Sequence, residues 1–248
     1  MGNEASSESS PEKYFGYRVL GVQASSPASK VGLVSFFDFI VEANGVPLYS
    51  KEISYFVNLI REFSDKELPL LVYNCKMHTT REVVLVPTTN WPGEGYLGVA
   101  IRFDSYLDAE EHLCHVLEVE PDSPAELAGL QASTDYLLGT SNLVFNDTDI
   151  LFEELSLHID RTCEFYVYSS VTDEVRVVVI MPNTQWGGEG ILGAHIAHGY
   201  LHGLPSKCCQ TIGHSTEMAL QPALQLRMQS QALAQEMNLN TGVEASST

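Results

Sequence analysis

Residues 87–101 and residues 182–196 of this chain repeat each other, and this repeat constrains the possible fold more than any other feature. The two segments read PTTNWPGEGYLGVAI and PNTQWGGEGILGAHI, with nine of fifteen positions identical at a distance of 95 residues. The match extends upstream, where Ser26-Pro27-Ala28 corresponds to Ser123-Pro124-Ala125. A repeat of this length is a duplicated domain, because the units of solenoid proteins are about 20–50 residues long. The sequence therefore predicts two domains of the same fold.

Each copy combines strands with short helices. In the first copy we expect strands at 17–22, 37–43, 68–73, 81–86 and 97–103, a short helix after Pro27 and a longer helix over 50–63. Apolar residues at Ile53, Phe56, Val57 and Ile60 follow the period of a helix. The second copy follows the same order, with its longer helix near 148–158. The predicted fold class is α+β.

The net charge of −19, from 13 Lys+Arg and 32 Asp+Glu in 248 residues, excludes two classes of partner. Proteins bind nucleic-acid backbones, and dock electrostatically on anionic membranes, through clusters of Lys and Arg. Neither partner suits a chain with this excess of acidic residues. No run approaches the roughly 18 apolar residues that span a bilayer. Five cysteines without zinc-type spacing indicate a reduced protein on the cytosolic side.

Gly93–Gly98 and Gly188–Gly193 both match the pattern G-x-G-x-x-G of dinucleotide-binding loops. Such a loop must open a helix, whereas here strand-like residues follow. A loop that offers backbone N–H groups to a peptide carboxylate, ahead of a strand with an open edge, fits better. The histidines at 195, 198 and 202 do not share one side of a strand, so we expect no metal site. No catalytic motif is present, and we expect neither an enzyme nor a cofactor.

The first six residues, Met1-Gly2-Asn3-Glu4-Ala5-Ser6, match the M-G-x-x-x-S acceptor pattern of N-myristoylation, with Gly2 as the acylated residue. One myristoyl chain gives only marginal, reversible attachment to a membrane. We therefore expect a second anchor, either a membrane-bound partner protein or acylation at a site such as Cys208 or Cys209.

These features together resemble the Golgi reassembly and stacking protein (GRASP) family over residues 1–205. The similarity is carried by Gly16-Tyr17, Phe36–Val41, Trp91, Leu97-Gly98-Val99, Ile101-Arg102-Phe103, Leu127–Leu130, Asp135-Tyr136, Trp186–Gly190, Leu192-Gly193 and Gly199–His202. Arg18 and Asp104 stand where animal members carry His and Cys, so a thiol- or metal-dependent partner contact is not implied at that place.

The resemblance implies two tandem PDZ-like, partly open β-barrels with short helices and a permuted strand order, in which the groove strand comes last. We expect a disordered, acylated N-terminus at 1–13, PDZ-like domains at 14–108 and 109–205, and a mostly disordered tail at 206–248. The implied peptide-binding residues are Leu59, Ile60, Leu97, Gly98, Val99, Ala100 and Ile101 in the first groove, and Leu192, Gly193, Ala194, His195 and Ile196 in the second.

The resemblance also implies a function. It is that of a peripheral adaptor, lipid-anchored on the cytoplasmic face of Golgi membranes, that tethers cisternae by self-association in trans. Gly199, Tyr200, Leu201 and His202 would be the internal ligand for a neighbouring copy, and golgin-type or C-terminal peptides would be further partners. Family members are also linked to unconventional secretion. The alternatives are a general PDZ scaffold away from the Golgi and a regulatory module of a soluble enzyme.

Overall fold

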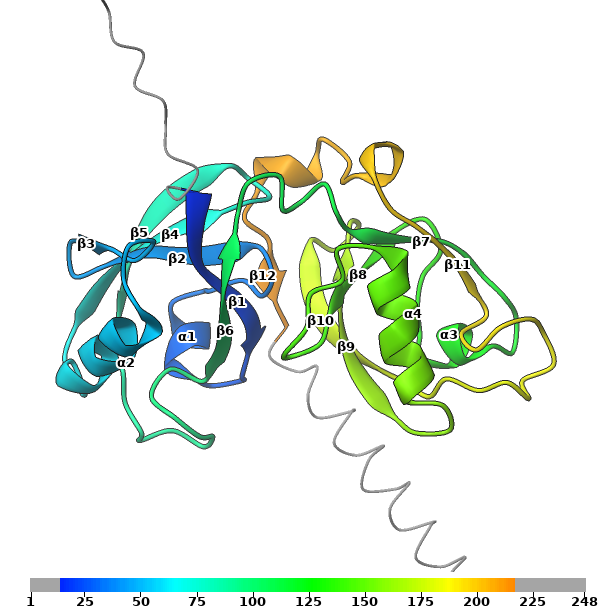
Figure 1. Ribbon diagram of the computed structural model, residues 1–248, viewed down its shortest axis with the longest axis horizontal. Helices are drawn as coiled ribbons and strands as arrows, with labels where there is room; N and C mark the ends of the chain where they lie inside the picture. Colours follow the sequence, from blue (N-terminus) through cyan, green and yellow to red (C-terminus); the bar gives the residue numbers. More distant parts are fainter. Residues whose placement is uncertain (1–13, 217–248) are drawn as a thin grey trace, which may run out of the picture.

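The structure is a computed structural model that describes residues 14–216, and it contains two six-stranded sheets, one for each copy of the repeat (Figure 1). The first sheet has the order β5-β4-β2-β1-β6, with β3 paired to β2. Its strands are β1 (Phe15–Val22), β2 (Asp38–Ala43), β3 (Val46–Pro47), β4 (Leu68–Asn74), β5 (Thr79–Leu85) and β6 (Val99–Ser105). The helices of this half are α1 (Pro27–Lys30) and α2 (Ile53–Glu62).

The second sheet repeats this arrangement in the order β11-β7-β8-β9-β10-β12. Its strands are β7 (Cys114–Val119), β8 (Asp135–Gly139), β9 (Cys163–Ser169), β10 (Glu174–Ile180), β11 (Ala194–Ala197) and β12 (His214–Ser215). The helices are α3 (Pro124–Leu127) and α4 (Thr148–Leu157), with 3₁₀ turns η2 (Tyr200–His202) and η3 (Cys208–Gln210). The α+β class and the tandem, PDZ-like organisation are confirmed, and within the described residues neither sheet closes into a barrel.

Local sequence signals explain the short elements. The hydroxyl of Ser26 caps α1 by accepting the N–H of Ser29 at 3.1 Å, and Pro27 occupies the first helical turn. Asn44 and Gly45 have φ values of 49° and 74°, as the tight turn between β2 and β3 requires. The expected strand at 97–103 begins two residues later, because Gly98 turns the chain with a φ of 66°.

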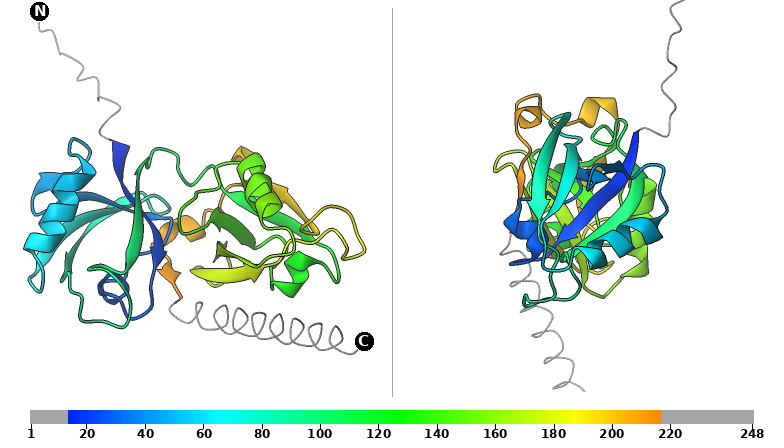
Figure 2. Two further views of the ribbon diagram at one scale, coloured as in Figure 1. Left: turned by 60° about the horizontal axis from the view of Figure 1, so that its bottom comes forward. Right: turned by 90° about the vertical axis from the view of Figure 1, so that its left-hand side faces the viewer.

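Each half has its own apolar core, and a third cluster lies between the halves. The first core includes Phe56, Leu59 and Ile60 of α2, and the second includes Leu151 and Leu155 of α4. The third cluster joins side chains from both halves: Leu20, Phe36, Phe37, Phe39, Tyr136, Leu138, Tyr168 and Val175. The two domains therefore share buried apolar surface. Figure 2 shows them side by side along the long axis of the molecule.

Residues 206–216 fall in the segment for which we expect a mostly disordered tail, but in the structure they form η3 and β12. β12 pairs in parallel with β10, at the edge of the second sheet, and lies between the two domains (Figure 1). Ser215 also reaches the first domain, where its hydroxyl accepts the N–H of Ser35 at 2.9 Å. These residues are ordered because they fill the space between the sheets. The expected disorder at 1–13 and 217–248 lies outside the described residues.

Among the helices of residues 14–216, none has the length and apolar character that crossing a bilayer requires.

Candidate peptide-binding grooves

β6 and β11 lie at the ends of their sheets. β6 pairs antiparallel with β1, and β11 pairs antiparallel with β7. Within residues 14–216 the opposite edge of each strand has no strand partner. Such an edge can accept an extended peptide as an additional strand. β6 is the last strand of the first copy, and β11 is the last strand of the second copy before β12. This order agrees with the permutation that the resemblance implies.

A glycine-rich loop leads into β6 and is closed by a tryptophan. The indole N–H of Trp91 donates to the carbonyl oxygen of Gly95 at 2.8 Å. The φ of 66° at Gly98 is a conformation that residues with a side chain rarely adopt. A Cβ atom at Gly98 would lie 2.2 Å from the Cβ of Ser26. A substitution at Gly98 would therefore disrupt the loop itself and would be a poor test of ligand binding.

The polar groups of this loop are arranged for an anion. The carbonyl oxygen of Leu97 accepts the N–H of Ala28 at 3.0 Å, and that of Gly98 accepts the N–H of Gln23 at 2.9 Å. The N–H groups of Leu97 and Gly98 have no acceptor within the part of the chain that the structure describes. Successive unpaired N–H groups in a turn form a concave site that suits a carboxylate.

The second loop repeats this geometry. The indole N–H of Trp186 donates to the carbonyl oxygen of Gly190 at 3.0 Å, and Gly193 has a φ of 67°. The carbonyl oxygen of Gly193 accepts the N–H of Glu120 at 2.9 Å. Among residues 14–216 no acceptor contacts the N–H groups of Leu192 and Gly193. The second loop has the backbone of a carboxylate site as well.

An apolar groove of about 360 Å³ runs along β6 beside α2. It is lined by the loop and strand residues Leu97, Gly98, Val99, Ala100 and Ile101, all of which the sequence predicts. The wall from α2 consists of Val57, Ile60 and Arg61. This groove has both parts of a peptide site, an open strand edge and an apolar wall, with the anion-binding loop at one end.

The predicted wall residues divide between the groove and the core. Ile60 belongs to the first core and also lines the groove, whereas Leu59 packs into that core with Phe56 and is not among the groove residues. Val57 and Arg61 are groove residues that were not predicted from the sequence. The helical period contained the signal for both, because Val57 lies three residues before Ile60 and Arg61 lies beside it on the same turn.

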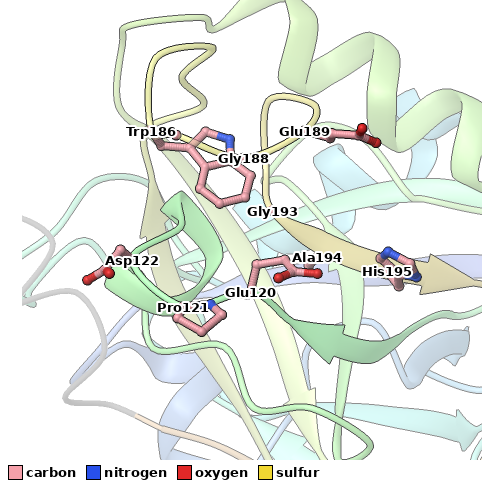
Figure 3. Close-up of a pocket in the computed structure, with 10 residues that line it drawn as sticks. Glu120, Pro121, Asp122, Trp186, Gly188, Glu189, Gly193, Ala194 and His195 are labelled. Carbon is pink, nitrogen blue, oxygen red and sulfur yellow. The ribbon is translucent and has the colours of Figure 1, made fainter.

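The second groove differs in its side chains. Phe152 of α4, which is 40 % exposed, stands 95 residues after Val57, while Leu155 is buried in the second core. A cavity of about 520 Å³ opens at the second loop and is lined by Trp186, Gly193, Ala194 and His195, with Trp186 and His195 on opposite sides of the opening (Figure 3). The other predicted residues are Leu192, which is buried in the core, and Ile196, which is half-buried further along β11.

Tyr200 and Leu201 are presented to solvent more fully than any other large apolar side chains of residues 14–216. Each is 88 % exposed, at the start of the turn η2. Gly199 introduces this turn with a φ of 95°, and the ring of His202 lies 6.1 Å from that of His115. Within the predicted self-association segment, Tyr200 and Leu201 therefore project from the domain, whereas Gly199 and His202 are half-buried and His202 packs against His115.

Arg18 and Asp104 form an ion pair between β1 and β6. Nη1 of Arg18 lies 3.2 Å from Oδ2 of Asp104, and Nε of Arg18 donates to the carbonyl oxygen of Phe36 at 2.9 Å. Only 2 % of the Arg18 side chain is exposed. A buried arginine requires such partners, so these two residues hold the groove strand against the rest of the sheet.

Thiol chemistry is not supported by the environment of the core cysteines. Burial raises the pKa of Cys75 to about 12, and it does the same for Cys114 and Cys163. These thiols stay protonated near neutral pH and are poor nucleophiles. Among residues 14–216 no three His, Cys, Asp or Glu side chains lie where they could hold a metal ion.

The comparison with known families agrees with this geometry. The family model described as the GRASP55/65 PDZ-like domain matches residues 5–101 and residues 80–207. The chain belongs to the GRASP family. This family is a scaffold family without a known enzymatic role.

Relatives in animals and yeast extend the comparison. Golgi reassembly-stacking protein 1 of Mus musculus is 42 % identical over 207 residues, which are 84 % of this chain and 46 % of the relative. The Homo sapiens protein of the same name is 40 % identical over 84 % of this chain and 47 % of its own length. An uncharacterized protein of Schizosaccharomyces pombe is 33 % identical over 77 % of this chain and 54 % of the relative. The chain spans about half the length of these relatives.

Proposed function

We propose that this protein is a Golgi-associated peripheral membrane adaptor that tethers cisternae by self-association in trans. The observation that carries the proposal is that one chain presents both halves of a contact. The groove beside β6 is open and apolar, and Tyr200 and Leu201 project from η2 with 88 % of each side chain exposed. Because these two side chains are so exposed, they do not occupy a groove of their own chain.

A contact of this kind joins copies by strand addition. The residues that follow Gly199 would lie along β6 of a second copy, with an apolar side chain against Val57 and Ile60. A single groove of this size binds weakly. Many copies on two facing membranes convert weak contacts into strong adhesion, because each bond raises the effective concentration of the next.

Attachment to the membrane is assigned to Gly2, which lies outside the described residues. Its myristoyl chain would supply one weak anchor. The net charge of −19 repels anionic headgroups, so a second anchor is needed. Cys208 is buried and does not suit acylation, which leaves Cys209 or a protein receptor. Golgin-type partners, bound through the grooves, fit this need, and a role in unconventional secretion belongs to the same proposal.

The Leu201→Asp variant tests self-association. A charge at this position cannot enter an apolar groove without losing its hydration, so we expect the dimer affinity to fall at least about tenfold in sedimentation velocity. Leu127→Asp is the matched control, because Leu127 of α3 is also highly exposed, at 82 %, and lies away from η2. Equal sedimentation of the two variants would contradict the proposed contact.

Golgi localisation and the lipid anchor at Gly2 are tested together in cells. A copy tagged at its C-terminus keeps the N-terminus free, and we expect it on Golgi membranes. The Gly2→Ala variant should move to the soluble fraction, since the acyl chain needs the amine of Gly2. Retention of Gly2→Ala on membranes would contradict the lipid anchor. A wild-type copy that is membrane-bound elsewhere would support the alternative, a general PDZ scaffold away from the Golgi.

A further inference from the structure

The two glycine-rich loops differ in the side chains around them, although their backbones repeat each other. Gln23 and Glu120 occupy the same place, because each donates its backbone N–H at 2.9 Å to the carbonyl oxygen of the glycine that ends its loop, Gly98 or Gly193. The side-chain oxygen of Gln23 lies against the first loop, 2.7 Å from where a Cβ atom of Gly93 would be. A neutral amide therefore borders the first loop, and a carboxylate stands at the corresponding place in the second.

The remaining charges around the two loops strengthen this contrast. The first groove is lined by one cation, Arg61, and one anion, Glu94. The second cavity is lined by Glu120, Asp122 and Glu189, and neither lysine nor arginine is among its lining residues. On α4 the residue that corresponds to Arg61, 95 positions later, is Ser156. Glu94 and Glu189 correspond to each other across the repeat, but only the first groove balances its glutamate with an arginine. The two loops thus offer similar backbone N–H groups in different electrostatic surroundings, without net charge from Arg61 and Glu94 at the first groove and with three carboxylates at the second cavity.

Figure 3 shows how these carboxylates are distributed. Glu120 and Asp122 lie on the segment before α3, Glu189 lies on the loop across the opening, and Gly193 is between them. An incoming carboxylate would have to approach the N–H groups of Leu192 and Gly193 past three like charges. Each such charge within a few ångströms costs on the order of a tenfold loss of affinity near a protein surface.

We propose that the first loop alone captures peptides by a free C-terminal carboxylate, and that Glu120, with Asp122 and Glu189, excludes such peptides from the second loop. The position shared by Gln23 and Glu120 is then specificity-determining. This inference rests on the proposed capture of peptides by the grooves and assigns a ligand chemistry to each.

The chain provides one reporter for each loop, because Trp91 and Trp186 are its only two tryptophans. Each indole N–H is bonded within its own loop and gives a separate cross-peak in a ¹⁵N–¹H spectrum of the full chain. The probe is an acetylated hexapeptide that ends in valine, as the free acid and as the C-terminal amide. The background carries Leu201→Asp, so that the η2 turn of another copy does not compete for the first groove.

We expect the free acid to shift the Trp91 peak in a saturable manner, and the amide to bind at least about tenfold more weakly. The Trp186 peak should not move with either peptide.

The variants test which side chains cause this difference. Replacing Glu120 and Glu189 by Gln should let the free acid shift the Trp186 peak, and Gln23→Glu should weaken the binding of the free acid at Trp91. Glu153→Gln removes one charge from the exposed face of α4 and should change neither titration. Glutamine preserves the shape of glutamate, and the two indole peaks themselves report whether each loop has folded.

Three results would overturn the inference. Equal shifts of both indole peaks by the free acid would show that the loops do not discriminate. An unmoved Trp186 peak in the E120Q/E189Q variant, with its loop folded, would show that these carboxylates are not the barrier. Equal affinity of acid and amide at Trp91 would show that no terminal carboxylate is read. In each case a Leu201-dependent self-association in sedimentation would still support the proposed tethering, so the two failures are distinguishable.

Discussion

Asp38 and Asp135 are buried carboxylates at matching places in the two copies, and an arginine neutralises each of them. Nη1 of Arg81 donates to Oδ1 of Asp38 at 2.9 Å, and Nη1 of Arg176 donates to Oδ1 of Asp135 at 3.2 Å. The other oxygen of Asp38 accepts the backbone N–H of Val34 at 2.7 Å. Each pair therefore ties the turn that precedes its central strand, β2 or β8, to the distant strand β5 or β10.

Removing one partner of such a pair leaves an uncompensated buried charge. We expect Arg81→Met to lower the free energy of unfolding by about 3–5 kcal/mol, measured by urea denaturation at pH 7. Arg161→Met is the control, because Arg161 is exposed and its substitution should cost less than about 0.5 kcal/mol. A loss in Arg81→Met as small as that of the control would mean that the ion pair does not stabilise the fold.

The sequence predicted the residues whose signals are local and missed those whose partners are distant. Ser26 as a cap and Asn44-Gly45 as a turn follow from neighbouring residues alone. Asp38 and Arg81 lie 43 residues apart, and the repeat aligns each with its counterpart without showing that they meet. The sequence shows that Phe36 is apolar but not that it packs between the domains. No periodicity distinguishes a core within a domain from a core between two domains.

At the scale of elements, residues 211–216, which include β12, form a short strap that contacts both domains. The N–H of His214 donates to the carbonyl oxygen of Asp173 at 3.2 Å, and that of Thr216 donates to the carbonyl oxygen of Val175 at 2.9 Å. On the other side, the side-chain amide of Asn74 donates to the carbonyl oxygen of Ile212 at 3.3 Å. Backbone hydrogen bonds thus hold the strap to the second domain, and side-chain hydrogen bonds hold it to the first.

Proline at position 214 should release the strap, because it removes the N–H that bonds to Asp173. We expect His214→Pro to increase the rate of tryptic cleavage after the exposed Lys207 several-fold, as mass spectrometry of timed digests would show. His214→Ala is the matched control, since it keeps the N–H and loses only an exposed imidazole and its contact with Glu174. Similar cleavage of both variants would contradict a strap held by its backbone.

Long, periodic elements could be predicted, and β12 could not. The period of Phe56 and Ile60 placed α2 to within three residues of its observed ends, Ile53 and Glu62. The edge strands were predicted from the strand-like residues after each glycine loop. β12 has two residues and no alternation, so nothing in its own sequence indicates a strand. It forms only because the edge of β10 is available next to Asn74.

At the scale of the molecule, Lys76 joins three parts that are distant in sequence. Its Nζ lies 3.4 Å from the hydroxyl of Tyr168 and 3.3 Å from that of Thr211, and it forms an ion pair with Asp173. The ring of Phe37 lies 5.8 Å away and adds a favourable cation–π contact. Lys76 is fully buried, although from the sequence a lysine in a turn between two strands is expected to be exposed. The first domain, the second domain and the strap thus meet at one cation.

Asp173 makes this junction sensitive to acid. Burial acts to raise the pKa of Asp173, but hydrogen bonds from Lys76, Thr211 and Tyr168 outweigh it and hold the pKa below its ordinary value of 3.8. A carboxyl whose pKa is lower in the folded state stabilises the protein above its unfolded pKa. This contribution is lost as the pH falls through the lowered, folded-state pKa.

Asp173→Asn should therefore destabilise the protein in a pH-dependent manner. At pH 7 it leaves the buried Lys76 without its anion, and we expect a loss of about 3 kcal/mol in the free energy of unfolding. The gap between wild type and variant should shrink as the pH falls below 3.8, because the unfolded chain then binds a proton at Asp173 that the folded protein does not yet bind, and the contribution is gone once the pH is below the lowered, folded-state pKa. Urea denaturation at pH 7, 5, 4 and 3 measures this gap, with Asp160→Asn as the control for an exposed aspartate. A gap of equal size at pH 7 and pH 3 would mean that the charge of Asp173 does not hold the domains together, and the apolar cluster around Phe37 would then account for the junction by itself.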